Sequence, residues 1–493
     1  MVYPQMTPII ELFRCNMINF KHYKLQEEVM TQQVEGWTHM VNSNPYLYAA
    51  VSLLDELEKM GGEAYIVGGA VRDILLNKSS HDIDIATNVP MADIEKKFNS
   101  AEIGQSRGFG ILNVKYGEFN FEVAQFRTES GYSDNRRPDT VETTKSFEKD
   151  TERRDLTINS MGLDKNGTII DYQGGIEDLN NKIIKSVGVA KYRFMEDSLR
   201  ILRVVRFAAR MGFKIDPETK AALNEMGHLV ENISPERIRD EMFKAAESGK
   251  TLASFFELLN DTGILEKILP EFTNLQGKPH TKETHPEGDA YEHTMAAIRA
   301  STSTNPITNL AVAFHDLGKA ITLTFNDTGK PQYKGHENEG LVLIDAIANR
   351  LKFSNKDKHS IKFAMANHMQ FHHIKDMKKS KVLSMRQSPD WEHLKHTMYS
   401  DEASRGAPLF NPEEFQAKMD YIEDVYKKFG ETAEFEAKMA TLITGKIIID
   451  LIPGIKGPVI GKIKDAVRQW IVDNDFNVTP SQVEQKIKEL GNV

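Results

Sequence analysis

The chain has 493 residues, of which 40% are hydrophobic and 27% are charged, with a single cysteine and a formal net charge of −9. This length is too great for one hydrophobic core, so about three or more domains are expected, and the composition excludes a disordered or fibrous chain. The lone Cys15 excludes an internal disulfide framework and fits a reducing compartment. The negative charge excludes a uniformly basic coat, so any RNA contact must come from local basic stripes.

No apolar run is long enough to cross a bilayer, because the best candidate, residues 442–455, is interrupted by Lys446 and Asp450. The first residues also lack the basic stretch and apolar core of a signal peptide. We therefore expect a cytoplasmic protein with no membrane partner.

Residues 1–45 are a polar extension with scattered aromatic residues, and no motif in them indicates a role. From residue 46 a helical pattern runs to a stop at Gly61-Gly62. Short β-like runs follow at 65–69, 81–87, 110–117 and 120–127. Residues 46–180 are therefore expected to form an α+β domain.

The stretch from 131 to 155 is polar, charged and poor in apolar residues, and it is predicted to be a mobile loop. Beyond residue 180 the strand signal fades and helical periodicity dominates. Proline and glycine breaks near residues 269–289 and 404–415 indicate linkers. We expect helical units at 181–275 and 276–410, followed by a helical tail at 411–493.

Two aspartates, Asp82 and Asp84, stand one residue apart in a β-like run. On a strand, side chains at i and i+2 point to the same face, so both carboxylates are predicted to face one site. Paired carboxylates suit Mg²⁺, and a two-metal site can activate an attacking hydroxyl and stabilise a leaving pyrophosphate. Gly68 and Gly69, at the start of a predicted helix, let backbone amides approach phosphate, and Arg72 adds a forked cation.

The run G-G-x-V-R-D at 68–73, followed by D-I-D at 82–84, resembles the signature of the class II tRNA nucleotidyltransferase and bacterial poly(A) polymerase family. The resemblance implies a polymerase-beta-like nucleotidyltransferase head with a small mixed sheet, and it adds Asp73 to the nucleotide site. A third acid on the neighbouring strand completes such a site, and Glu122 is the candidate.

"RRDLTINSM" at 153–161 is similar to the family's second motif. The similarity implies that Arg154 contacts the nucleotide, while Asp155 and Asn159 hold the loop and the sugar.

"EDSLRILRVVRF" at 196–207 resembles the family's template motif, in which Asp197 and Arg200 read the base. The two residues are three apart in a helical pattern, which predicts one helix face. Arginine offers only donors and aspartate only acceptors, and C and A both present a ring-nitrogen acceptor beside an amino donor. U and G have the opposite polarity and would leave buried polar groups unpaired. Arg203 is expected to help bind the triphosphate and Arg206 to reach RNA phosphates.

A second set of motifs resembles the HD metal-dependent phosphohydrolase domain present in a subset of bacterial tRNA nucleotidyltransferases. The implied metal ligands are His293, His315, Asp316 and Asp401. Imidazoles with carboxylates suit Ni²⁺, Mn²⁺, Fe²⁺ or Mg²⁺. Lys319 is a candidate for binding substrate phosphate, and His336 and His368, with His285 a weaker candidate, are candidates for a second metal or for the substrate.

The resemblance to this family implies an enzyme that adds C, C and A to the 3′ end of tRNA from CTP and ATP, with Mg²⁺, and that does not act on DNA. The alternatives are a poly(A) polymerase and an enzyme that adds only A or only CC. A different class is an HD phosphohydrolase whose head merely binds RNA. The sequence does not indicate the oligomeric state.

Overall fold

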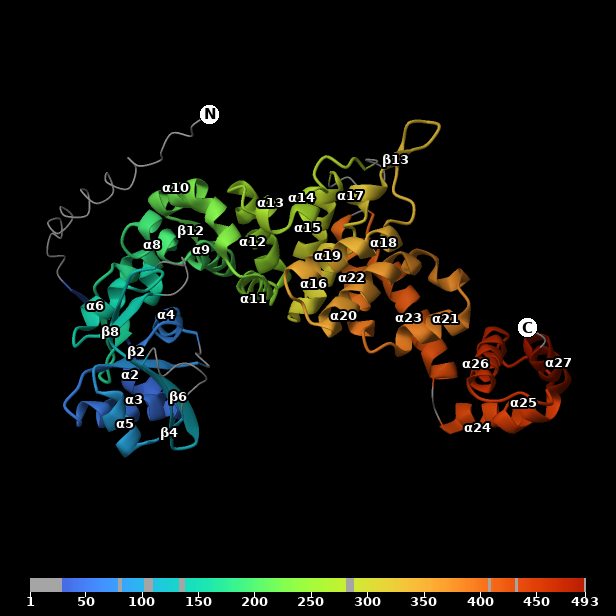
Figure 1. Cartoon of the computed structure of the whole chain (residues 1–493), viewed down its shortest axis with the longest axis horizontal. Helices are drawn as coiled ribbons and strands as arrows, with labels where there is room; N and C mark the ends of the chain where they lie inside the picture. Colours follow the sequence, from blue (N-terminus) through green and yellow to red (C-terminus); the bar gives the residue numbers. More distant parts are fainter. Residues whose placement is uncertain are drawn as a thin grey trace, which may run out of the picture. The chain divides into compact units, whose positions relative to one another are not determined.

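The computed structural model describes residues 29–78, 82–101, 110–132, 138–280, 288–406, 409–430 and 433–491. The chain divides into two compact units, residues 1–232 and 233–493 (Figure 1). Among the described residues, no helix is both long enough and apolar enough to cross a membrane.

Unit 1 is built around a mixed sheet that, in the described part of the chain, has eight strands in the order β1-β10-β9-β2-β3-β6-β5-β4. All neighbours are antiparallel except β3 and β6, which run parallel. The strands are β1 (Met30–Gln33), β2 (Ala64–Val67), β3 (Asp84–Thr87), β4 (Asn99–Ala101), β5 (Ile111–Tyr116), β6 (Phe119–Gln125), β9 (Gly162–Leu163) and β10 (Thr168–Asp171). The expected α+β head with a small mixed sheet is therefore confirmed.

Residues 30–45, which the sequence placed outside the head, belong to its fold. β1 pairs with β10 at the edge of the sheet, and α2 (Trp37–Ser43) buries Trp37 and Val41. The indole of Trp37 donates to the carbonyl of Lys165 at 3.0 Å. This segment was missed because β1 is wholly exposed and polar, so it carries no alternation of apolar residues.

Alternate residues of the sheet face two different cores, as a period of two requires. Toward one face, α3 (Pro45–Glu58) packs on β2, β3 and β6, and it buries Leu53, Leu54 and Leu57 completely. On the other face, Val67, Ala86, Phe126 and Phe147 form a second cluster. The remaining helices beside the sheet are α4 (Gly69–Leu75), α5 (Met91–Lys97), α6 (Phe147–Glu152), η2 (Thr157–Asn159) and α7 (Gly175–Asn180).

The segment predicted to be a mobile loop at 131–155 is largely ordered, so that prediction was wrong for its described part. β7 (Arg127–Ser130) pairs with β8 (Thr140–Thr143), and α6 follows. The segment is anchored because Phe147 is 3% exposed in the second core cluster and Asp150 is fully buried. Residues 133–137 lie outside the described part of the chain.

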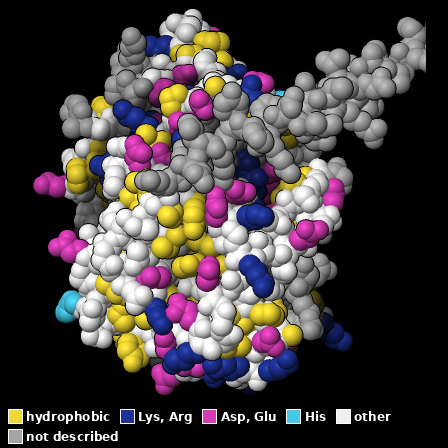
Figure 2. Space-filling model, turned by 90° about the vertical axis from the view of Figure 1, so that its left-hand side faces the viewer, with side chains coloured by type: hydrophobic (Ala, Val, Ile, Leu, Met, Phe, Trp, Pro, Cys, Tyr) yellow, Lys and Arg dark blue, Asp and Glu magenta, His cyan; other side chains and the backbone are white. Residues whose placement is uncertain are grey.

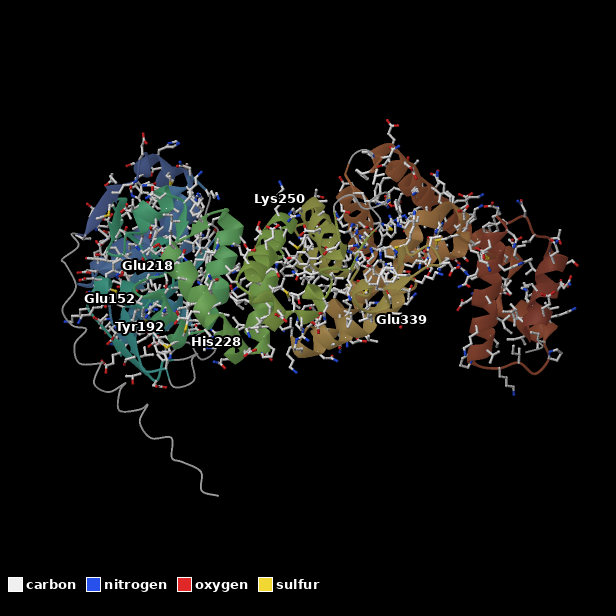
Figure 3. All side chains as sticks on the ribbon, turned by 90° about the horizontal axis from the view of Figure 1, so that it is seen from above. Glu152, Tyr192, Glu218, His228, Lys250 and Glu339 are labelled. Carbon is white, nitrogen blue, oxygen red and sulfur yellow. The ribbon has the colours of Figure 1, made fainter. Side chains whose placement is uncertain are left out.

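Two helices that flank the predicted base-reading residue Asp197 belong to unit 1. α8 (Ala190–Glu196) presents Tyr192, labelled in Figure 3, with 53% of its surface exposed. α9 (Leu199–Met211) buries most of its length and ends at Gly212, whose φ of 66° allows the left-handed cap. Short elements complete the unit: β11 (Ile183–Ile184), β12 (Lys214–Ile215), α10 (Pro217–Met226) and η3 (Gly227–Asn232).

Unit 2 is helical apart from one short hairpin in its described part, as the periodicity beyond residue 180 predicts. Exposed side chains such as Lys250 and Glu339 stand out from the helices that carry them (Figure 3). Its elements up to residue 404 are α11 (Pro235–Ala245), α12 (Gly249–Asp261), α13 (Leu265–Ile268), α14 (Pro270–Thr273), α15 (Ala290–Ala300), α16 (Pro306–Phe314), α17 (Lys319–Thr322), β13 (Thr324–Phe325), β14 (Pro331–Gln332), α18 (His336–Glu339), α19 (Leu341–Arg350), α20 (Asn355–Asn367), η4 (His368–Asp376), α21 (Lys379–Gln387) and α22 (Trp391–Ser404).

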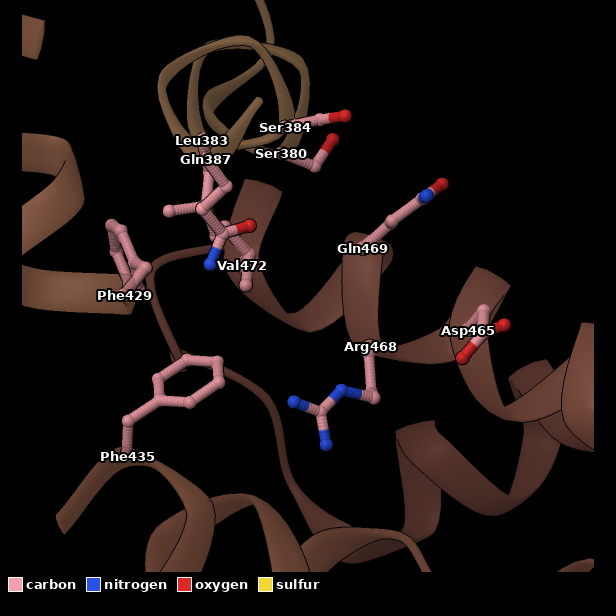
Figure 4. Close-up of a pocket in the computed structure, with 10 residues that line it drawn as sticks. All are labelled: Ser380, Leu383, Ser384, Gln387, Phe429, Phe435, Asp465, Arg468, Gln469 and Val472. Atoms are coloured by element: carbon pink, nitrogen blue, oxygen red, sulfur yellow. The ribbon is translucent and has the colours of Figure 1, made fainter. Parts of the chain in front are cut away.

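The last helices are α23 (Pro412–Phe429), α24 (Ala433–Leu442), α25 (Gly445–Leu451), α26 (Pro458–Asp473) and α27 (Pro480–Gly491). A pocket of about 260 Å³ lies between α21 and these last helices, with Phe429 and Phe435 on one side and Arg468 of α26 facing them (Figure 4). Arg468 is ion-paired with Glu436 and lies over the Phe435 ring at 5.5 Å. None of the residues that line this pocket is a predicted site residue.

Candidate active site and candidate metal centre

Three carboxylates meet at one edge of unit 1. β3 and β6 run side by side in a register that places Asp84 directly beside Glu122. Asp82 precedes β3, which begins only at Asp84, so the prediction that both aspartates lie on the strand was wrong in that detail. The structure nevertheless places Asp82, Asp84 and Glu122 close enough that their charges interact.

This clustering changes the chemistry of Asp84. Burial, followed by the negative charges of Asp82 and Glu122, raises its pKa to about 6, while Arg154 opposes the shift. Carboxylates that repel one another in a partly dry site are stabilised by a divalent cation, and hard oxygen donors are the ligands that Mg²⁺ prefers. The donor set therefore fits the metal that the sequence predicts.

The chain turns sharply beside these acids. Gly68 has a φ of 73° and leads directly into α4, and a side-chain carbon placed on it would lie 3.5 Å from an oxygen of Asp84. Glycine adopts this conformation without strain, so the backbone can run next to the carboxylate. Gly69 opens the helix, and a carbon added there would lie 3.4 Å from the guanidinium of Arg72.

Arg72 is buried and links two of the predicted motifs. Its Nη1 donates to the side-chain oxygen of Asn159 at 2.7 Å, and its Nε and Nη2 donate to Asp73 at 3.0 and 2.8 Å. Only 7% of Arg72 is exposed. In this structure the Arg72 guanidinium therefore bonds to the side chains of Asp73 and Asn159 and not to solvent.

The second motif is organised by a residue that the sequence did not single out. Asp150 is fully buried and accepts hydrogen bonds from Arg153 at 2.7 and 2.9 Å and from Arg154 at 3.0 and 3.3 Å. The backbone N–H of Arg127 donates to it at 3.2 Å. Burial alone would raise the pKa of Asp150, but Arg154 and Arg153 outweigh it and hold the pKa below its ordinary value.

Arg203 of α9 reaches back to this loop. Its Nε donates to Asp155 at 2.7 Å, and its Nη2 lies 2.6 Å from the same carboxylate oxygen. The other oxygen of Asp155 accepts from the backbone N–H of Leu156 at 2.8 Å. Asp155 and Arg203 therefore form a direct link between the second motif and the helix of the template motif.

The two predicted base-reading residues do not share a helix face, because Asp197 lies between α8 and α9 in an extended conformation. Its carboxylate accepts from the N–H of Leu199 at 3.1 Å and its carbonyl from the N–H of Arg200 at 3.0 Å. Arg200 is 7% exposed and donates to Glu196 at 2.9 Å and to the carbonyl of Arg153 at 2.9 Å. The helical prediction failed because Asp197 favours capping over continuing the helix.

Three guanidinium groups lie near the ring of Phe207, and the sequence did not predict that they would be neighbours. Arg72, Arg203 and Arg206 lie 5.3, 5.5 and 4.3 Å from its ring centroid. Arg206 is 3% exposed, so it does not present a surface charge in this structure, contrary to the expected phosphate contact. Figure 2 shows that basic side chains elsewhere on this unit gather along one edge of the face drawn, with acidic ones scattered between.

Unit 2 holds a buried cluster of four histidines and two aspartates. Its members are His293, His315, Asp316, His336, His368 and Asp401, none more than 7% exposed. Within three overlapping sets of these residues, the potential ligand atoms all lie within 4.8 Å of one another.

Asp316 stands between two groups of imidazoles. Its Oδ2 lies 3.4 Å from Nε2 of His293 and 3.3 Å from Nε2 of His315, and its Oδ1 lies 3.0 Å from Nε2 of His336. Asp401 lies 3.1 Å from Nε2 of His293. One carboxylate that faces two groups of ring nitrogens has the arrangement of a ligand bridging two ions.

The ring orientations are fixed from outside the cluster. His315, His336 and His368 each place Nδ1 at 2.7 to 2.8 Å from a backbone carbonyl. A carbonyl only accepts, so Nδ1 carries a hydrogen and Nε2 is the ring nitrogen directed into the cluster. His293 places Nδ1 3.1 Å from the hydroxyl of Ser404.

Charge within the cluster is strongly coupled. Burial alone would lower the pKa of His315, but Asp316 and Asp401 outweigh it and raise the pKa to about 10. Burial and the neighbouring His315 lower the pKa of His368 to about 3. The protein on its own thus places positive charge at the position where a metal ion would lie.

The Leu-Gly-Lys sequence after Asp316 has a steric reason. A side-chain carbon on Gly318 would lie 1.9 Å from the carbonyl oxygen of His336, so only glycine allows α17 to meet α18. Lys319 follows, is 7% exposed, and lies 2.6 Å from Asp316. The sequence missed His280, whose ring packs against His293, while the predicted His285 lies outside the described residues.

Two segments of the chain match models of known protein families. Residues 64–185 match the family model described as the poly A polymerase head domain. Residues 212–275 match a probable RNA and SrmB-binding site of polymerase A. The first match contains the three carboxylates and the second motif.

Curated relatives cover part of the chain. A CCA-adding enzyme of Lactobacillus johnsonii is 40% identical over 248 residues, which are 50% of this chain and 61% of that relative. One from Leuconostoc citreum is 46% identical over 196 residues, 40% of this chain and 48% of that relative. The chain thus spans about half to three fifths of the length of these relatives.

Solved structures can be aligned with nearly the whole of this chain. The CCA-adding enzyme of Bacillus stearothermophilus in complex with CTP has a TM-score of 0.65 at 24% identity, over 91% of this chain and 98% of that one. The Thermotoga maritima CCA-adding enzyme complexed with tRNA has a TM-score of 0.57 at 17% identity, over 94% and 99%. This chain therefore has the fold of the solved CCA-adding enzymes, with a head similar to that of poly A polymerases.

Proposed function

We propose that this chain is a template-independent tRNA nucleotidyltransferase that adds C, C and A to the 3′ end of tRNA, from CTP and ATP, with release of pyrophosphate. The observation that carries the proposal is the set of three carboxylates, Asp82, Asp84 and Glu122, gathered beside the Gly68 turn. Similarity to curated relatives named CCA-adding enzymes supports the choice of reaction.

In the proposed mechanism Asp82, Asp84 and Glu122 would hold two Mg²⁺ ions. When bound, such ions lower the pKa of the attacking 3′ hydroxyl and neutralise the departing pyrophosphate. The chain's own task is to place the triphosphate in line with that hydroxyl. Gly68 and Gly69 allow the backbone amides to lie close to the triphosphate. Arg154, which is held by Asp150, supplies positive charge near Asp84.

Base selection is assigned to Asp197 and Arg200. Both terminal guanidinium nitrogens of Arg200 donate within the protein, Nη1 to Glu196 and Nη2 to the Arg153 carbonyl. Reading a base requires the exchange of such bonds for bonds to the acceptor of C or A, while Asp197 accepts from the amino group. U and G present the opposite polarity and leave both groups unpaired, at a cost of about 1–3 kcal/mol for each group.

Incorporation of each labelled nucleotide into tRNA transcripts that end before CCA, after C, and after CC tests the proposal. Ordered addition of C, C and A that then stops supports it. Addition of A to the CC-ended transcript alone means an A-adding enzyme, and addition of C alone means a CC-adding enzyme. Unlimited addition of A to any RNA means a poly(A) polymerase. If no nucleotide is added, the alternative of an HD phosphohydrolase whose head merely binds RNA remains.

A second activity is supported by the buried cluster in unit 2. We assign it to a metal-dependent phosphohydrolase that acts on 2′,3′-cyclic or terminal phosphates. His293, His315, Asp316 and Asp401 would hold one ion, and His336 and His368, which face the other oxygen of Asp316, a second. Lys319 is placed to attract a phosphate. Imidazole-rich sites suit Ni²⁺, Mn²⁺ or Fe²⁺ better than Mg²⁺.

Metal analysis of the purified protein, with hydrolysis assays on 2′,3′-cyclic nucleotides and on a 3′-phosphorylated RNA, tests this activity. About one or two bound transition-metal ions per chain and hydrolysis that a chelator abolishes would support it. A protein that binds no such ion at micromolar concentrations and hydrolyses neither substrate would contradict it. On this proposal residues 181–275 serve as the neck, 276–410 as the HD domain and 411–493 as the tail.

A further inference from the structure

The hydroxyl of Tyr46 lies at the point where the strand with the metal carboxylates begins. It accepts a hydrogen bond from the backbone N–H of Ile83 at 3.3 Å, and Ile83 stands between Asp82 and Asp84. β3 begins at Asp84, so this N–H precedes the paired residues of the strand. Tyr46 therefore supplies an acceptor just outside the strand pairing.

The ring of Tyr46 also contacts the strand of the third acid. It stacks on Phe121 with the centroids 5.0 Å apart and the planes 10° apart, and it lies 5.2 Å from Phe119. Phe121 is 1% exposed and immediately precedes Glu122 on β6. One side chain thus touches both segments that carry the carboxylates, from the core side of the sheet.

The position of Tyr46 is set by the start of α3. The side chain of Asn44 accepts from the backbone N–H of Tyr46 at 3.0 Å and of Leu47 at 3.2 Å, and Pro45 occupies the first helical position. Burial raises the pKa of Tyr46, and the charges of Asp82 and Asp84 raise it further. The side chain is therefore a neutral phenol close to both acids at neutral pH.

We propose that Tyr46 is a positioning residue for the nucleotidyl-transfer site, which holds the Asp82-Ile83-Asp84 segment against β6 so that the three carboxylates converge. The need arises because the carboxylates repel one another and Asp82 lies outside the strand pairing. The hydrogen bond from Ile83, which lies between Asp82 and Asp84, fixes this segment to the Tyr46 hydroxyl. Because the Tyr46 ring also stacks on Phe121 of β6, it opposes the repulsion from the α3 side of the sheet. The assignment rests on the proposed function of the head, and it adds a residue from a helix outside the sequence motifs.

Substitution of the hydroxyl alone tests the inference. Tyr46→Phe keeps the stacking and loses the acceptor, and Tyr48→Phe on the same helix, where Tyr48 is 57% exposed, is the matched control. Mn²⁺ binding to the full chain is titrated by electron paramagnetic resonance, and the head's ions are identified as those lost in Asp84→Asn. Loss of a supporting hydrogen bond at a metal site weakens metal affinity by about 10–100-fold, and about 10-fold is expected for Tyr46→Phe.

Nucleotide addition provides a second readout. The Mg²⁺ concentration for half-maximal addition rises in Tyr46→Phe by about the same factor as the Mn²⁺ dissociation constant, while the KM for CTP at saturating Mg²⁺ stays unchanged. A purely structural role for Tyr46 would lower the melting temperature and leave both metal dependences in place. That result, or equal Mn²⁺ affinities in Tyr46→Phe and Tyr48→Phe, overturns the inference.

The two proposals fail separately. If the unsubstituted protein adds no nucleotide but Tyr46→Phe still weakens Mn²⁺ binding by the head, the proposed reaction is wrong and the positioning role stands. If the unsubstituted protein adds CCA and Tyr46→Phe matches it at every Mg²⁺ concentration, the reaction stands and the positioning role is wrong. Tyr46→Ala, which also removes the stacking, is expected to weaken Mn²⁺ binding at least as much as Tyr46→Phe.

Discussion

Asp84 and Glu122 lie directly side by side on the parallel strands β3 and β6. The fold thus places two negative side chains together at the only parallel pairing within its described eight-stranded sheet. With Asp82 adjacent, burial of Asp84 and repulsion by Asp82 and Glu122 together raise the pKa of Asp84 to about 6 in the metal-free protein.

Asp84→Asn should therefore stabilise the metal-free protein at neutral pH. The folded-state pKa of Asp84 is raised above 3.8, so the folded protein binds the proton more tightly and loses stability as pH rises from about 4 through about 6. Asparagine does not ionise, and the variant is expected to gain about 1–3 kcal/mol in free energy of unfolding at pH 8 and nothing at pH 4.

Urea denaturation in the presence of a chelator measures this gain, with Asp93→Asn on the half-exposed surface of α5 as the control. The same Asp84→Asn variant should have no nucleotide addition at any pH. Equal stability of the variant and the unsubstituted protein at pH 8 would mean that neither burial nor the neighbouring acids destabilise the ionised Asp84.

Arg200→Lys should relax base selection. Lysine keeps the charge but loses the planar fork, so it cannot replace both donors. The resulting unpaired groups cost about 1–3 kcal/mol each, which corresponds to roughly a 10–100-fold loss of discrimination against UTP and GTP. Competition assays with all four nucleotides on CC-ended tRNA measure it, and Arg210→Lys at the exposed end of α9 is the control. Unchanged discrimination would remove Arg200 from the template.

Asp150→Asn should destabilise unit 1. Asp150 is fully buried and bonded to both Arg153 and Arg154, so removal of its charge takes this carboxylate from both guanidinium groups and leaves Arg153 with Glu129 at 3.4 Å. Breaking such a buried pair costs about 3–5 kcal/mol. Thermal or urea unfolding measures the loss against Glu152→Gln, an exposed change on the same helix (Figure 3). If the two variants are equally stable, Asp150 does not anchor the segment.

The two proposed sites should be separable by mutation. Asp82→Ala is expected to abolish nucleotide addition and to leave phosphohydrolase activity intact, while His315→Ala should do the reverse and lower the metal content of the purified protein. Both activities and the metal content are measured on the same preparations, with His359→Ala, whose side chain is 73% exposed, as the control. Loss of both activities in either folded variant would refute the two-site arrangement.

The sequence identified the acids but not what supports them. Asp82 and Asp84 are visible as a spaced pair. Glu122 is the third acid that the family resemblance implies on the neighbouring strand. Tyr46 and Phe121 meet only through tertiary packing of α3 on the sheet, for which no local pattern exists. Residues of this kind are set by long-range contacts, so single-sequence reasoning has no signal for them.

Polar composition misled the prediction in two places. Residues 138–155 read as a mobile loop because charged residues dominate, yet Phe147 and Asp150 anchor them from inside the fold. Asp197 reads as helical because its neighbours are periodic, yet its carboxylate caps the following turn. In both cases a buried or capping carboxylate satisfied backbone or arginine donors, which composition does not reveal.

Three imidazoles of the unit 2 cluster are each aimed by a carbonyl three residues earlier in the chain: His315 by Val312, His336 by Tyr333 and His368 by Met365. Each ligand therefore takes its orientation from its own turn of backbone and not from another ligand. Loss of one histidine leaves the others aimed at the centre, so ion affinity declines in steps. In the proposed metal site, a change of ion content would therefore not require the surrounding helices to rearrange.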